Sequence, residues 1–207
     1  MVASSRLGLL QGAVEPALKG NSALDKFQHI VISEHALLGS VKDMLTKKTM
    51  FPKAKRRVQN IDHAFSDRDI KLHLAIAPQA ECLTSLLSDD DIQLGRLNGA
   101  FPVHSWADLV RRIRDACPRA NVIIWDFEKP DEIERSFFSS LLDVGDDLLD
   151  DRTEHELLGK ACEQLKSAKL LSKIVQIDEE LQTRMDAQYE LDLDAIATMP
   201  NVVLKRS

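Results

Sequence analysis

The sequence predicts an α/β fold: a parallel sheet flanked by helices on both faces. Three short apolar runs, residues 28–33, 72–77 and 121–125, are typical of buried strands. Long segments with helical periodicity separate these runs, as expected when crossover helices join parallel strands. Neither an internal repeat nor a Gly/Ser-rich linker divides the 207 residues. We therefore expect a single domain over residues 1–207.

Apolar residues at helical spacing predict the connecting helices. The expected helices cover residues 34–45, 53–65, 78–87, 106–117, 133–142 and 189–199, with two or three more within 154–187. Ser105 is expected to cap the helix over 106–117, with Arg111, Arg112 and Arg114 on its solvent side. Residues 126–131 predict a charged turn, and residues 200–204 a last short strand.

Composition narrows the class of protein. The net charge of −6 argues against a general nucleic-acid-binding surface. Cys82, Cys117 and Cys162 are far apart, which disfavours both a disulfide framework and a zinc cage and predicts a cytoplasmic protein. No apolar run approaches the roughly 20 residues of a membrane helix, so we expect no membrane partner. The acidic run at residues 89–91 lacks the fuller oxygen set of a calcium loop, and we predict no metal site.

The segment 70–87 is the main candidate site. Its apolar strand ends before Pro78, which suits the first turn of a helix because proline lacks the N–H that would be unpaired there. A strand that leads directly into a helix presents free N–H groups at the carboxyl edge of a sheet. Proteins of the α/β class commonly bind anions at such a place. The segment therefore predicts a phosphate-binding corner, by which we mean the end of the strand at Ala77 together with Pro78 and the first turn of the helix that follows.

Five segments, in this order, resemble bacterial proteins of the sulfotransferase-like P-loop family. They are residues 30–35, residues 51–57, the segment 70–87, residues 106–114 followed by 122–128, and residues 189–196. The family's donor is 3′-phosphoadenosine-5′-phosphosulfate. The resemblance implies that an N-terminal strand–loop–helix holds the phosphosulfate, while an Arg at a strand end and a Ser eight residues later hold the 3′-phosphate. Ser85 aligns with that Ser, and Ala77 aligns with the Arg.

The chain departs from the family pattern in two places. The family's first strand and phosphate loop have no counterpart in the sequence, and Ala77 can neither carry a charge nor donate a hydrogen bond. An Arg–phosphate pair is bidentate and charge-assisted. At roughly 1.5–3 kcal/mol per charged hydrogen bond, its loss is expected to weaken donor binding strongly.

The resemblance also implies catalytic residues. Glu34 and His35 follow the first predicted strand, where the family can place the general base that takes a proton from an acceptor hydroxyl. The alternative is that Glu34 stabilises the positive end of a helix. Ser85 would contact the donor phosphate, or would bond a backbone carbonyl one turn back.

Three functions stay open. The first is transfer of a sulfuryl group from the nucleotide donor to a hydroxyl of a carbohydrate or small metabolite. The second is a degenerate family member that acts as a binding or assembly partner. The third is an unrelated α/β regulatory module. A missing first strand would also leave an open sheet edge, which predicts a homodimer.

Other conspicuous residues are expected to be structural. His73 is predicted to be a hydrogen-bonded core histidine. The basic run from Lys47 to Arg57 is either a solvated helix face or a surface that steers an anion. Aromatic residues are expected in the core, with the Tyr189 hydroxyl at its edge; they are Trp106, Trp125, Phe137 and Tyr189.

Overall fold

The computed structural model describes residues 37–39, 43, 49–83, 101–127, 136, 137, 139–141 and 177–206. In this part of the chain, β1 (Lys71–Ile76), β2 (Asn121–Asp126) and β3 (Val202–Lys205) form a parallel sheet in the order β1-β2-β3. The helices are α3 (Ala54–Ala64), α5 (Trp106–Ala116) and α8 (Glu179–Ala197). The predicted α/β class with a parallel sheet is confirmed.

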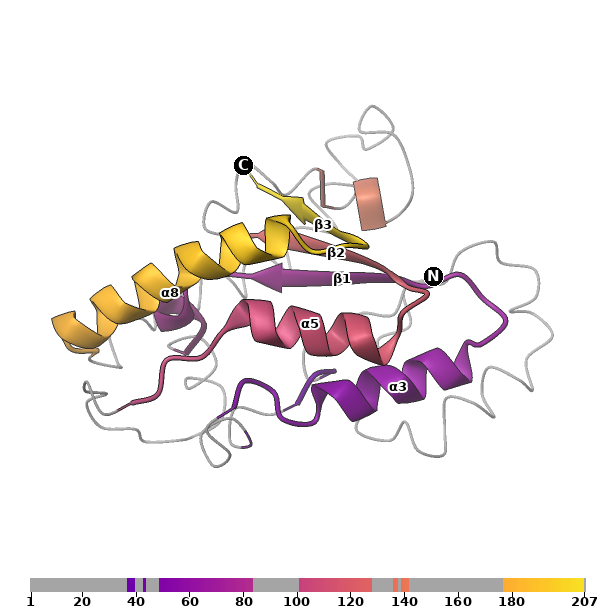
Figure 1. Cartoon of the computed structure of the whole chain (residues 1–207), viewed down its shortest axis with the longest axis horizontal. Coiled ribbons are helices and arrows are strands. Elements are labelled where there is room, and N and C mark those ends of the chain that lie inside the picture. The colour runs from indigo at the N-terminus through magenta and orange to yellow at the C-terminus, as the bar shows by residue number, and fades with distance from the viewer. Residues whose placement is uncertain are drawn as a thin grey trace, which may run out of the picture.

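All three strands end at the same edge of the sheet. In the register of β1 and β2, Ile76 lies opposite Asp126, and Trp125 in turn lies opposite Lys205 of β3. The helices α3, α5 and α8 precede β1, β2 and β3 respectively; α5 begins at the carboxyl edge of the sheet, α8 begins beyond that edge, and α3 packs against α5 (Figure 1). The start of α5 and the carboxyl ends of the strands therefore meet at one edge (Figure 1), which is where α/β proteins commonly place their sites.

Side chains alternate between the two faces of the sheet. One face carries Ile76, Val122 and Ile124, which are buried in the main core with residues of α5 and α8. The other face carries His73 and Trp125. Phe137, in a helical stretch of the chain, packs edge-on against Trp125 with ring centroids 5.3 Å apart, so aromatic rings cover this second face.

The start of α5 is fixed by a buried carboxylate on α8. Asp192 is 2% exposed and accepts hydrogen bonds from Ser105 Oγ and from the Trp106 backbone N–H, both at 2.6 Å. Ser105 in turn accepts from the backbone N–H of Asp108, so its predicted role as N-cap is confirmed. Two helices far apart in sequence thus share one polar junction at the carboxyl edge.

Arg112 corrects one expectation about α5. Its guanidinium was expected on the solvent side, but it donates to the backbone carbonyls of Met50 at 2.6 Å and Phe51 at 3.2 Å. Its Nε also pairs with Asp108 one turn earlier, at 3.0 Å. Arg112 therefore ties α5 to the segment that leads into α3. The fork of donors on a guanidinium suits this bridging of carbonyls.

Two further elements differ from their prediction. The strand β1 was expected to be buried on both faces, but Ala75 is exposed, only Ile76 is fully buried, and residues 72–74 are half-buried. The last helix was expected to begin at residue 189, but α8 is continuous from Glu179. Asp178 caps it through a bond from the Leu181 N–H, and no Gly or Pro interrupts it.

Several predicted elements lie outside the described residues. They are the strand at 28–33, nearly all of the helix at 34–45, the end of the helix at 78–87, about half of the helix at 133–142, and residues 154–176 of the helices predicted within 154–187. The predicted helices at 53–65 and 106–117 and the last strand are confirmed within one or two residues.

Replacing Asp192 with Ala is expected to lower the free energy of unfolding by about 3 kcal/mol, because buried donors at the start of α5 lose their acceptor. Asp194→Ala is the matched control, since Asp194 is an exposed aspartate of the same helix. Denaturant unfolding followed by tryptophan fluorescence measures both. Equal losses in the two variants would contradict this role of Asp192.

Candidate functional site

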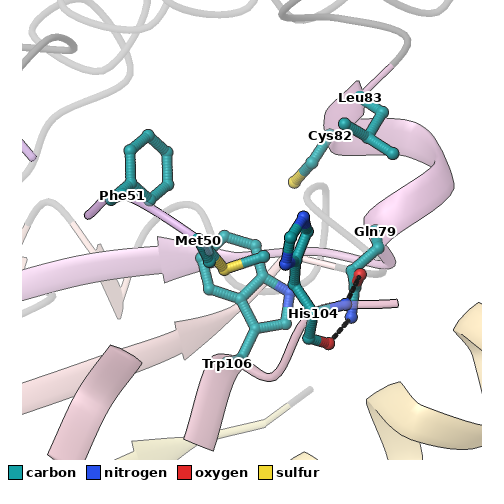
Figure 2. Close-up of a pocket in the computed structure, with 7 residues that line it drawn as sticks. All are labelled: Met50, Phe51, Gln79, Cys82, Leu83, His104 and Trp106. Carbon is teal, nitrogen blue, oxygen red and sulfur yellow. Dashed lines mark hydrogen bonds between the residues drawn. The ribbon is translucent and has the colours of Figure 1, made fainter. Parts of the chain in front are cut away.

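A small cavity lies at the carboxyl edge of the sheet, beside the end of β1. Its volume is about 10 Å³, and three segments of the chain line it (Figure 2). These segments lead into α3, follow β1, and lead into α5. The lining residues are Met50, Phe51, Gln79, Cys82, Leu83, His104 and Trp106.

Gln79 fastens the segment before α5 to the corner after β1. It is 1% exposed, and its side-chain amide donates to the His104 carbonyl while its side-chain oxygen accepts from the His104 N–H at 2.9 Å. Both polar ends of Gln79 are therefore engaged by one backbone unit, as Figure 2 shows. A buried amide satisfied in this way is held in one orientation.

Side chains next to the predicted phosphate-binding corner bond to the protein backbone there. The chain after β1 is helical at residues 79–83, as Pro78 predicts. The Ala77 carbonyl accepts a hydrogen bond from the Trp106 indole N–H at 3.0 Å and a weaker contact from Cys82 Sγ at 3.8 Å. The predicted site residues Glu34, His35 and Ser85 lie outside the described residues, so their roles stay predictions.

Burial controls the chemistry of the two titratable groups in the cavity. Loss of solvent lowers the pKa of His104, so its ring is neutral at pH 7. Burial raises the pKa of the Cys82 thiol to about 12, with a smaller opposing effect from a backbone hydrogen bond with Ala77. A thiol of this kind is protonated at neutral pH and is a poor nucleophile.

A second polar cluster lies at the end of the central strand. Asp126 is 4% exposed and accepts a hydrogen bond from the Tyr189 hydroxyl at 2.7 Å. Arg206, just past β3, lies 3.5 Å from Asp126 and 3.4 Å from Glu190. Asp126 was expected in a charged turn; it is instead the buried last residue of β2. Tyr189 packs in the core as predicted, with its hydroxyl engaged by this carboxylate.

His73 is a structural residue, as predicted. Its Nδ1 accepts a hydrogen bond from the Trp125 indole N–H at 3.2 Å, and the two rings are stacked. Burial lowers the pKa of His73, with a smaller contribution from Lys71. The neutral ring therefore accepts at Nδ1 and carries its proton on Nε2.

Part of the basic run is tied to neighbouring protein groups. Lys53 pairs with Asp43 at 2.9 Å, and Arg57 donates to the Leu37 carbonyl at 3.1 Å. Lys55 and Arg56 are exposed on α3. Residues 47 and 48 lie outside the described residues. The run therefore contributes to local structure, and its steering of an anion stays a prediction.

Comparison with known proteins gives no match among family models, curated proteins or solved structures. Within the described residues, no three His, Cys, Asp or Glu side chains are grouped so that they could hold a metal ion. None of the helices described here combines the length and the apolar content that crossing a bilayer requires.

Sequence reasoning missed Gln79, His104 and Asp192. Gln79 lies at a helix start next to Ala80 and near the apolar Cys82 and Leu83, and a glutamine there needs a hydrogen-bond partner if it is buried. His104 directly precedes the predicted N-cap. Neither position reveals that the two residues meet, since they are 25 residues apart.

Gln79→Glu is expected to lower the free energy of unfolding by about 2 kcal/mol, because a carboxylate oxygen would replace the donor that faces the His104 carbonyl. The control is Gln59→Glu, an exposed glutamine on α3 for which a change within about 0.5 kcal/mol is expected. Urea unfolding measures both. If Gln79→Glu lost no more stability than its control, the stabilising role of the Gln79–His104 hydrogen bonds would be refuted.

Proposed function

We propose that this chain is a sulfotransferase-like domain that acts as a binding or assembly partner and does not transfer sulfuryl groups. The observation that carries the proposal is that polar groups in the corner after β1 are hydrogen-bonded within the protein. The Ala77 carbonyl is engaged by Trp106, and the Gln79 amide is engaged by the His104 backbone. Two hydrogen-bond donors beside this corner, the Trp106 indole N–H and the Gln79 side-chain amide, are thus already used within the protein.

The charges at the carboxyl edge support the same proposal. The buried side chain at the end of the central strand is a carboxylate, Asp126, which repels an anionic donor. The neighbouring cation, Arg206, lies within ion-pair distance of Asp126 and Glu190. Position 77 supplies no cation in place of the family's Arg. In the described part of the chain, the corner thus lacks the charge-assisted donors that hold a phosphate.

Location and assembly are parts of this proposal. The thiols of Cys82 and Cys117 are free, which supports a reducing compartment such as the cytoplasm. In the described sheet β3 has one strand neighbour, and its Val203 is 49% exposed. These features favour a homodimer through the open edge of β3.

Calorimetric titration with adenosine 3′,5′-bisphosphate, the desulfated donor, tests the loss of donor binding. We expect no saturable binding up to about 1 mM, a limit equivalent to roughly −4 kcal/mol. Ala77→Arg restores the family's cation without removing Trp106 or Gln79, and it is also expected not to bind.

Two results would contradict the proposal. Micromolar binding by the natural chain would favour the alternative, sulfuryl transfer to a hydroxyl with Glu34 or His35 as base and Ser85 on the donor phosphate. Micromolar binding by Ala77→Arg alone would mean that the corner is open and lacks only one side chain.

A further inference from the structure

The cavity beside β1 contains a polar atom that the fold leaves unsatisfied. His104 is 7% exposed, and within the described part of the chain its Nε2 has no hydrogen-bond partner. Figure 2 shows the distal end of this ring and the Cys82 thiol pointing toward the same space, with the Met50 thioether beside the ring. An unpaired buried polar atom costs about 1–3 kcal/mol. Such an atom in a folded protein therefore calls for an occupant.

The size and lining of the cavity restrict that occupant. A volume of about 10 Å³ admits one particle of the size of a water molecule. A buried water needs two to four polar partners. Besides His104 Nε2, the cavity offers the sulfurs of Cys82 and Met50, which are weak hydrogen-bond partners. The Gln79 amide is already engaged by the His104 backbone. Water would be poorly held here.

We propose that the cavity binds a single copper(I) ion through Cys82 Sγ, His104 Nε2 and Met50 Sδ. Thiolate and thioether sulfurs favour soft metals, among them copper(I), and neutral imidazole is a common ligand for copper. A hard cation such as calcium or magnesium would need several oxygen ligands. A structural zinc ion would need four ligands of the nitrogen, sulfur or carboxylate type. The two sulfurs and one nitrogen fit a soft ion of low coordination number.

Binding is a simple ligand exchange. The copper–sulfur bond forms as the Cys82 thiol releases its proton to solvent, and the ion stays copper(I) throughout. The neutral His104 ring and the Met50 thioether donate lone pairs and lose no proton. Because the ligands come from the segments before α3, after β1 and before α5, the ion would join three parts of the chain and stabilise the folded state.

Anaerobic competition against a chromophoric copper(I) chelator tests the site. The starting protein is the Cys117→Ser/Cys162→Ser chain, in which Cys82 is the only remaining thiol. We expect this chain to withdraw one equivalent of copper(I) from the chelator. Met50→Leu is expected to weaken binding about tenfold, since it removes one ligand while nearly conserving volume. Cys82→Ser is expected to abolish binding. Met185→Leu, in the core on α8, is the matched control and should bind as the starting protein does.

X-ray absorption at the copper edge gives a second readout. The loaded chain is expected to show one nitrogen and two sulfur neighbours. The proposal is overturned if the single-thiol chain withdraws no copper(I) from the chelator, or if Met50→Leu binds as tightly as Met185→Leu. Because Met50→Leu is expected to fold, this comparison decides the matter even if Cys82→Ser does not.

Discussion

The carboxyl edge of the sheet depends on one buried carboxylate. Asp192 extends from α8 and accepts hydrogen bonds from Ser105 and from the first backbone N–H of α5. A buried charge is tolerated only when it is hydrogen-bonded in this way, and the same bonds set where α5 begins. The position of α5 then sets the positions of His104 and Trp106, which precede and open it. The shape of the corner after β1 follows from this junction.

Under the proposed function, the bonds in the corner after β1 mean that a fold of the α/β class can be present without the anion binding that its carboxyl edge commonly supports. In parallel α/β folds, helix N-termini gather at the carboxyl edge and favour anions there. In this chain, the N-termini of α5 and α8 are capped by Ser105 and Asp178, and the corner after β1 is filled by Trp106 and Gln79. The Trp106 indole N–H, the Gln79 amide and the capped backbone N–H groups of α5 and α8 are thus used to hold the protein together.

The parts of the fold that were predictable are those that local sequence determines. The helix α5 follows from apolar periodicity and the Ser105 cap, and β2 follows from a compact apolar run. The Asp192–Ser105 bond joins residues 87 apart, and no local pattern reveals such a contact. The single helix α8 was divided in prediction because its apolar positions are irregular, although no breaker residue lies within it. The predicted catalytic residues Glu34 and His35, with Ser85, lie outside the described residues.

Hydrogen exchange at the Trp106 indole N–H, observed by ¹⁵N NMR, tests the closed corner most directly. The chain has two tryptophans, so a Trp106→Phe spectrum assigns the signal. If the Trp106–Ala77 bond closes the corner, the indole N–H signal should exchange slowly. The signal should also keep its chemical shift when adenosine 3′,5′-bisphosphate is added to about 1 mM. A signal that exchanges at once on transfer to heavy water, or that shifts with the nucleotide, would contradict the closed corner.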